Sequence, residues 1–201
     1  MLSKRLSKIT PSVTVGINSK VKELKSNGVE VINLSIGEPD FNVPEKAKEY
    51  GKKSLDDNIT KYNLVPGILE LREEICKKLK DENNIEYSPD QIVLSSGAKN
   101  SITNLLLAVT DPGDEVLLPL PYWVSYSEMV KIVNAVPVEV PTKKENSFKA
   151  TKEDLLASIT DKTKLIIITN PSNPTGAVYT RDELLEIAEV CLEKGIYIMA
   201  D

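Results

Sequence analysis

The chain has 201 residues, of which 41% are hydrophobic and 27% are charged, and its formal net charge is −5. A chain of this length can bury a substantial core and fold as one or two domains. The acidic balance argues against a nucleic-acid partner, which needs a concentrated basic patch, and no segment is apolar over the length of a membrane span.

The start of the chain and its rarest residue types narrow the cellular setting and the chemistry. Residues 1–8 lack the apolar core of a signal peptide, so we expect a cytoplasmic protein. The chain has no histidine, so acid–base chemistry must come from Lys, Asp, Glu or Tyr, or from residues beyond Asp201. Cys76 and Cys191 lie far apart within helical patterns, so we expect reduced thiols and no metal site.

The first part of the chain predicts two helices and one short strand. Helical periodicity predicts a helix over about 15–26, ended by an Asn-Gly pair, and a strand at 31–34. Pro44 suits the first turn of a helix that reaches about residue 55. Residues 56–67 then form a long connection that carries Tyr62.

After an amphipathic helix at 68–83, strands and helices alternate strictly along the chain. The predicted strands are 92–95, 115–118, 136–140, 165–169 and 196–200. The predicted helices between them are 100–109, 124–134, 152–159 and 181–194. This alternation indicates an α/β fold, a mostly parallel sheet with helices on both faces.

The loop at 170–176 follows a buried strand and reads Asn-Pro-Ser-Asn-Pro-Thr-Gly. Each proline fixes its own φ and biases the preceding Asn away from helix, so the two Asn side chains are held in set directions. Such a loop can aim an amide group at a ligand. A plain strand-to-helix connection is the alternative interpretation of this motif taken alone.

A second loop, at 95–100, reads Ser-Ser-Gly-Ala-Lys-Asn, leaves a predicted strand and opens a helix. Its backbone N–H groups and the positive end of the helix converge where an anion could sit. A tight strand-to-helix turn is the other interpretation. The loop is neither G-x-G-x-x-G nor a Walker loop, so a nucleotide-binding α/β protein is disfavoured.

Trp123 and Asp201 each stand at the end of a predicted strand. Trp123 follows Pro121 and Tyr122 at the carboxyl end of its strand, where open α/β sheets bind ligands. Its flat ring could cover a planar cofactor, with core packing as the alternative. Asp201 ends a buried strand, where an unpaired charge is costly, so we expect a cationic partner.

These motifs occur in one order, together with Ser-Ile-Gly-Glu-Pro-Asp-Phe at 35–41, and with Lys-Tyr at 61–62, Pro-Gly at 66–67 and Glu-Leu-Arg at 70–72. Over residues 11–201 they resemble the class I aminotransferases of the large pyridoxal-phosphate fold, particularly the bacterial aspartate aminotransferase branch. The resemblance implies roughly the N-terminal half of such an enzyme. Residues 1–61 would be an N-terminal arm and part of a small domain, and residues 62–201 an incomplete cofactor-binding large domain.

The resemblance assigns the phosphate group of pyridoxal 5'-phosphate to two places. It implies that Gly97, Ala98 and Lys99 wrap the phosphate through their backbone. It also implies that Tyr62 reaches the phosphate of a neighbouring subunit, so we expect a homodimer when the protein is complete.

The cofactor ring is assigned to three further residues. The resemblance implies that Trp123 stacks near the pyridine ring and that Asn173 donates a hydrogen bond to its phenolic oxygen. Asp201 would pair with the protonated pyridine nitrogen and keep the ring cationic, so that it acts as an electron sink. The Leu120–Pro121 and Asn173–Pro174 bonds are expected to be cis, so that both loops aim into one pocket.

The resemblance also implies a set of residues that face the amino-acid substrate: Gly37, Trp123, Asn173, Lys99, Ser12 and Thr14. Lys99 would face the distal carboxylate of an acidic substrate, with a solvated surface lysine as the alternative. The lysine that forms the Schiff base would lie beyond Asp201, so no catalytic residue is expected within this chain.

The function implied is transamination between L-aspartate and 2-oxoglutarate with pyridoxal 5'-phosphate, by a chain that is inactive alone. Another aminotransferase or a C–S lyase of the same fold is the nearest alternative. A regulatory protein that senses pyridoxal phosphate is a third. Such regulators carry an N-terminal DNA-binding module, and residues 1–30 are too short and not basic enough to form one.

Overall fold

The computed structural model describes residues 2–11, 13–35 and 37–201. Its contacts divide the chain into two compact units. The first, which we call the sheet unit, comprises Met1–Val13 and Ile102–Asp201, and the second, the helical unit, comprises Thr14–Ser101. The two units are not the predicted domains of the complete enzyme, residues 1–61 and 62–201, and that domain division stays a prediction.

The sheet unit contains a four-stranded sheet in which every strand pair is parallel. Its strands are β1 (Glu115–Pro119), β2 (Val136–Val140), β3 (Thr163–Ile168) and β4 (Tyr197–Ala200). The apolar runs of β1 and β3 are buried, as expected for parallel strands covered on both faces. The predicted fold class is therefore confirmed.

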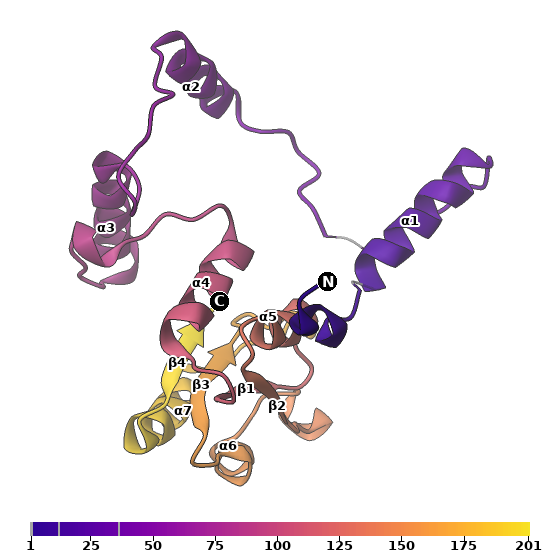
Figure 1. Ribbon diagram of the computed structural model, residues 1–201, viewed down its shortest axis with the longest axis vertical. Coiled ribbons are helices and arrows are strands. Elements are labelled where there is room, and N and C mark those ends of the chain that lie inside the picture. The colour runs from indigo at the N-terminus through magenta and orange to yellow at the C-terminus, as the bar shows by residue number, and fades with distance from the viewer. Residues whose placement is uncertain (1, 12, 36) are drawn as a thin grey trace. The chain divides into compact units, whose positions relative to one another are not determined.

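Helices cover both faces of this sheet (Figure 1). Because successive side chains of a strand point to opposite sides, each buried strand contributes to a core cluster on each face. Val116 and Leu118 of β1 pack in one core cluster with α4 (Ala98–Val109) and α5 (Ser125–Ile132). Leu117, between them, belongs to the cluster on the other face.

That second cluster is formed with α6 (Lys152–Ser158) and α7 (Arg181–Lys194), which contribute Leu155 and Ile187. A capping box starts α7, since Thr180 and Glu183 exchange hydrogen bonds between side chain and backbone. Gly195 ends it at a φ of +67°, a conformation that favours glycine. The predicted bounds of α7 are confirmed.

The strand order β2-β1-β3-β4 creates a switch point at the middle of the sheet. The chain leaves β1 through α5 to reach β2 on one side, and it leaves β3 through α7 to reach β4 on the other. The two neighbours β1 and β3 thus send the chain in opposite directions. In open α/β sheets, ligands bind beyond the carboxyl ends of such a strand pair.

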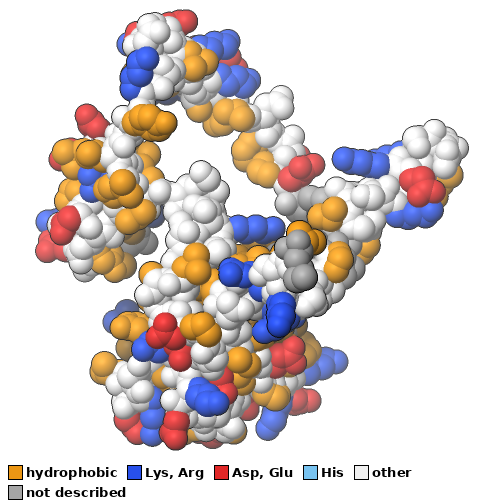
Figure 2. Space-filling model, viewed as in Figure 1, with side chains coloured by type: hydrophobic (Ala, Val, Ile, Leu, Met, Phe, Trp, Pro, Cys, Tyr) orange, Lys and Arg blue, Asp and Glu red, His pale blue; other side chains and the backbone are white. Residues whose placement is uncertain are grey.

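The helical unit contains the three other helices that the sequence predicted. They are α1 (Val13–Ser26), α2 (Glu45–Asp56) and α3 (Leu69–Asn83). Short 3-10 helices also occur in the chain, at Lys4–Lys8, Pro89–Gln91 and Lys144–Asn146. Figure 2 shows hydrophobic side chains at the surface along the helical unit.

The predicted strands at 31–34 and 92–95 were wrong, because neither segment is a strand in the structure. Ile32 and Leu34 are 87% and 91% exposed, so no core or neighbouring strand supports that segment among the described residues. In the second segment the Leu94 N–H donates to the Pro66 carbonyl (2.9 Å), a contact between loops. An apolar run becomes a strand only where another strand completes its hydrogen bonds.

Neither thiol forms a disulfide, and they differ in burial. Cys191 is buried within the α6 and α7 cluster, and burial raises the pKa of its thiol, whereas Cys76 of α3 is half-buried. The described residues contain no group of His, Cys, Asp and Glu side chains that could hold a metal ion. None of the helices in that part of the chain has the length and apolarity needed to cross a bilayer.

Candidate functional site

Three stretches that follow strands bring the predicted ring-binding residues to one edge of the sheet. Trp123 comes shortly after β1, Asn173 lies in the loop after β3, and Asp201 follows β4 directly. Because all four strands are parallel, these carboxyl ends meet at the same edge. The Leu120–Pro121 and Asn173–Pro174 bonds are cis as predicted, and Asn170–Pro171 is a third cis bond that the sequence analysis missed.

Tyr126, which the sequence analysis did not select, joins the ends of β3 and β4 to α5. Its side chain is only 1% exposed. Its hydroxyl lies 2.8 Å from the Thr169 hydroxyl and donates a hydrogen bond to the Asp201 carboxylate. Burial, together with this carboxylate, raises the pKa of Tyr126 to about 12, so the phenol stays protonated as a donor at neutral pH.

Trp123 is half-buried and contacts Tyr126 edge-on, with ring centroids 5.3 Å apart and planes at 89°. It also packs against the core cluster of α4 and α5, so core packing is part of its role. Tyr126 lies in the first turn of α5, three residues after Trp123, which precedes that helix. Its closeness to Trp123 in the segment that follows β1 was the local signal that could have identified it.

Asp201 lies directly after β4 with an exposed side chain, and the Tyr126 hydroxyl donates to its carboxylate. The cationic partner expected for this carboxylate stays a prediction. The Asp201 backbone is well fixed, because Asp201 N–H donates to Ile168 (2.9 Å) and its carbonyl accepts from Asn170 N–H (3.1 Å).

The loop at 170–176 is a closed turn with Asn173 exposed within it. Ser172 N–H donates to the Ala177 carbonyl and Gly176 N–H to the Ser172 carbonyl, both at 2.8 Å. Asn173 lines a small hollow together with Tyr126 and Thr169. The structure therefore brings Asn173 into the same hollow as the residue that binds Asp201.

The first turn of α4 belongs to the helical unit and follows a tight turn at Gly97. Gly97 has a φ of +86°, a region that favours glycine, and its N–H donates to the Ser95 carbonyl (2.9 Å). Helix α4 begins at the next residue, Ala98. Backbone N–H groups at the start of a helix, with the positive end of its dipole, suit a phosphate.

The other predicted site residues are placed as follows. Lys99 and Tyr62 have exposed side chains, and Gly37 lies in open space, with no atom near the position of an added Cβ. Thr14 lies in α1, and its side chain is not among the described features. Ser12 lies outside the described residues. The roles assigned to all of them stay predictions.

The N-terminal segment of the sheet unit reaches the chain that follows β1. Thr10 N–H donates to a Glu128 carboxylate oxygen (2.8 Å), and Lys131 binds the other oxygen of that carboxylate (2.8 Å). Burial opposes ionisation of Glu128, but these bonds hold its pKa below the usual value. Between the segments lies a mostly apolar hollow of about 620 Å³ that includes Pro121 and Tyr122.

Comparison with known proteins adds three findings. The family model for class I and II aminotransferases matches residues 29–201. A protein of Aquifex aeolicus named "Probable aspartate/prephenate aminotransferase" is 49% identical over 200 residues, which are 100% of this chain and 51% of that protein. The aspartate aminotransferase of Bacillus subtilis is 47% identical with the same coverage.

A solved structure is also closely similar. The aspartate aminotransferase from Thermus thermophilus with maleate has a TM-score of 0.96 and 41% identity, over 100% of this chain and 53% of that one. The chain thus spans about half the length of the relatives that it matches.

Proposed function

Because this chain belongs to the class I and II aminotransferase family, we propose that the whole protein is a pyridoxal-phosphate-dependent aminotransferase acting between L-aspartate and 2-oxoglutarate. Relatives named for aspartate transamination match the chain over its full length at 44–49% identity, which supports the aspartate specificity. They are about twice as long. We propose that the lysine that binds the cofactor covalently belongs to the half that this chain does not span.

The observation that carries this proposal is the Tyr126–Asp201 pair at the sheet edge beside Asn173. A fixed carboxylate suits a protonated pyridine nitrogen, and a side-chain amide suits a phenolic oxygen. The half-buried Trp123 adds a flat aromatic surface at the same edge. The first turn of α4 offers donors for a phosphate. These residue types fit pyridoxal phosphate.

Bound pyridoxal phosphate would supply an electron sink for the charge that develops at the substrate Cα. The residues of this chain bind and orient the group. Tyr126 holds one carboxylate oxygen of Asp201 and, with its raised pKa, keeps donating throughout the neutral range. This bond holds the Asp201 carboxylate in one orientation, in which it could pair with a cationic ring nitrogen.

A homodimer is part of the same proposal. Tyr62, which the family resemblance assigns to the phosphate of a neighbouring subunit, is fully exposed within the helical unit. Such exposure is compatible with a side chain that contacts a partner. Sedimentation of the whole protein at micromolar concentration tests this, and a monomer that is active would contradict it. A cytoplasmic location stays a prediction.

The decisive assay supplies the whole protein with pyridoxal phosphate, L-aspartate and 2-oxoglutarate and measures glutamate formation. We expect steady turnover, and Asp201→Ala should reduce kcat/KM by more than 100-fold, since the ring nitrogen then loses its charge partner. Alanine as the amino donor and prephenate as the amino acceptor test whether the protein is an aminotransferase with another substrate preference. Cofactor binding without turnover would favour the sensor, and release of pyruvate and ammonia from a cysteine conjugate would favour the lyase.

A further inference from the structure

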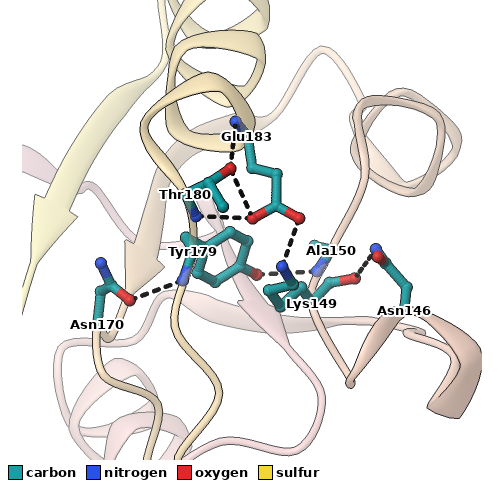
Figure 3. Close-up of polar contacts among 7 residues, drawn as sticks. All are labelled: Asn146, Lys149, Ala150, Asn170, Tyr179, Thr180 and Glu183. Atoms are coloured by element: carbon teal, nitrogen blue, oxygen red, sulfur yellow. Dashed lines mark hydrogen bonds and ion pairs between the residues drawn. The ribbon is translucent and has the colours of Figure 1, made fainter.

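Asn170 ties together two parts of the chain that each carry a candidate cofactor contact. Its backbone N–H donates to the Asp201 carbonyl (3.1 Å), which fixes the end of β4. Its side-chain Oδ1 accepts from the Tyr179 N–H (2.9 Å), where the chain returns from the 170–176 turn. Figure 3 shows this amide pointing from the end of β3 to the Tyr179 backbone.

The point to which Asn170 is attached is itself rigid. Tyr179 is only 7% exposed, and its hydroxyl accepts from the Ala150 N–H (2.8 Å) before α6. The Lys149 ammonium lies 5.9 Å from the centre of the Tyr179 ring and forms an ion pair with Glu183 of the α7 capping box (Figure 3). The ring of Tyr179 is therefore held by the segment just before α6, and through Lys149 that segment is joined to the start of α7.

The turn held at its base by this bond contains Asn173. Its own hydrogen bonds, from Gly176 to Ser172 and from Ser172 to Ala177, close the turn internally. They do not fix the turn to the sheet. Among the described contacts, the Asn170 side chain joins the segment that enters the turn to the segment that leaves it.

We propose that Asn170 is a positioning residue, which sets the placement of Asn173 relative to Asp201 and does not itself touch the cofactor. The inference rests on the proposed function, because that function assigns Asn173 and Asp201 to one pyridine ring. Two contacts to one rigid ring must both be placed within a fraction of an ångström to act together. A turn without its basal bond loses this placement.

The test compares Asn170→Ala with a matched control, Asn146→Ala. The Asn146 amide donates to the Lys149 carbonyl (2.9 Å), so the control also loses one bond from an amide to the backbone within the same cluster (Figure 3). The dissociation constant of pyridoxal phosphate is measured by the absorbance of the bound cofactor in the full-length protein. We expect about tenfold weaker binding for Asn170→Ala and less than about twofold for Asn146→Ala.

Two further variants keep the test decisive. Asn170→Asp retains an oxygen acceptor for the Tyr179 N–H and should bind the cofactor within about threefold of the unmodified protein. If Asn170→Ala fails to fold, Asn170→Ser replaces it, since the shorter side chain cannot span the same bond. The pH dependence of the bound cofactor's absorbance should shift in Asn170→Ala or Asn170→Ser and not in Asn146→Ala, because only the former disturb contacts to the ring.

Hydrogen exchange of the Tyr179 amide, measured beside cofactor affinity, distinguishes failure of this inference from failure of the proposed function. Faster exchange in Asn170→Ala with unchanged cofactor affinity and spectrum would show a purely structural bond, which overturns the inference and leaves the proposed function intact. Equal losses of affinity in Asn170→Ala and Asn146→Ala would overturn it as well. No binding of pyridoxal phosphate by the unmodified full-length protein would remove the proposed function and this inference together.

Discussion

The sheet unit and the helical unit use apolar residues in opposite ways. In the sheet unit, Leu106, Val116 and Ile166 have no exposed surface. In the described part of the helical unit, the one buried side chain is Arg72, while Ile32, Leu34 and other apolar side chains face outward. The difference teaches that apolar content alone does not make a core. A core forms where several secondary-structure elements pack against one another in layers, as the strands and helices of the sheet unit do.

Arg72 shows how the helical unit is held instead. Its guanidinium donates to the Gly67 carbonyl (3.2 Å) and to the Pro89 carbonyl (2.6 Å), so it joins the turn before α3 to the segment after it. A buried cation that binds carbonyl groups is a local clamp. It orders neighbouring turns but supplies little of the apolar burial that stabilises a domain.

The largest expected difference between the two units is in amide hydrogen exchange of the 201-residue chain. Amides of β1 and β3 should exchange at least about 1,000-fold more slowly than those of α2, because opening the sheet costs most of the unfolding free energy. Helix α2 has no buried residue in the structure. Exchange measured by mass spectrometry that protects α2 as well as β3 would break the comparison.

Core substitutions should show the same contrast in the free energy of unfolding. Ile166→Ala, at a fully buried position, should cost about 2–5 kcal/mol, through lost burial and a cavity. Leu34→Ala, at a position that is 91% exposed, should cost less than about 0.5 kcal/mol. Urea unfolding of both variants gives the two values. Similar losses would mean that Leu34 is covered in solution.

A contribution of the helical unit to substrate specificity would sharpen the comparison between the two units. If the helical unit supplies the contact to the distal carboxylate, Lys99→Ala in the whole enzyme should weaken aspartate far more than alanine. A lost charge-assisted contact is worth about 1.5–3 kcal/mol, or roughly 10–150-fold in kcat/KM. Lys46→Ala, on the exposed face of α2, is the control. Equal losses for both substrates would leave Lys99 without a role in specificity.

The smallest expected effect concerns Tyr126 and alkaline pH. Its folded-state pKa of about 12 lies above the ordinary value of 10.0, so its contribution to stability is complete below pH 10. That contribution, on the order of 2 kcal/mol, should be lost as the pH rises from 10 to 12. Tyr126→Phe should have a flatter stability profile over this range. A profile that parallels the unmodified protein would show that other groups cause the alkaline loss.

What the sequence could predict depended on how local each signal was. The bounds of α7 followed from a cap, a helical period and Gly195, which all lie within the element itself. Strand 165–169 was found because an apolar run of that length has few alternatives inside an α/β pattern. The false strand at 31–34 had the same local signal, and only the absence of a described neighbour distinguishes it.

The candidate site shows the same limit. Trp123, Asn173 and Asp201 were identified from motifs, and the structure places them at one sheet edge. Tyr126 was missed because its partners lie 43 and 75 residues further along the chain. Asn170 was noticed as part of a rigid loop, but its bond to Tyr179 depends on the path of the chain between residues 170 and 179. Such contacts between separate loops are set by the tertiary fold.

The parallel pairing of β1 with β3 has an evolutionary consequence. Val116 faces Leu165 and Leu117 faces Ile166 through bonds of the main chain, which do not depend on side-chain identity. The sheet therefore tolerates exchanges between apolar side chains at these positions, while the parts of the segments beyond Pro119 and Ile168 that carry no proposed cofactor contact can diversify. Descendants of such a chain can acquire new substrate preferences by changing those segments, with little penalty to the architecture that carries them.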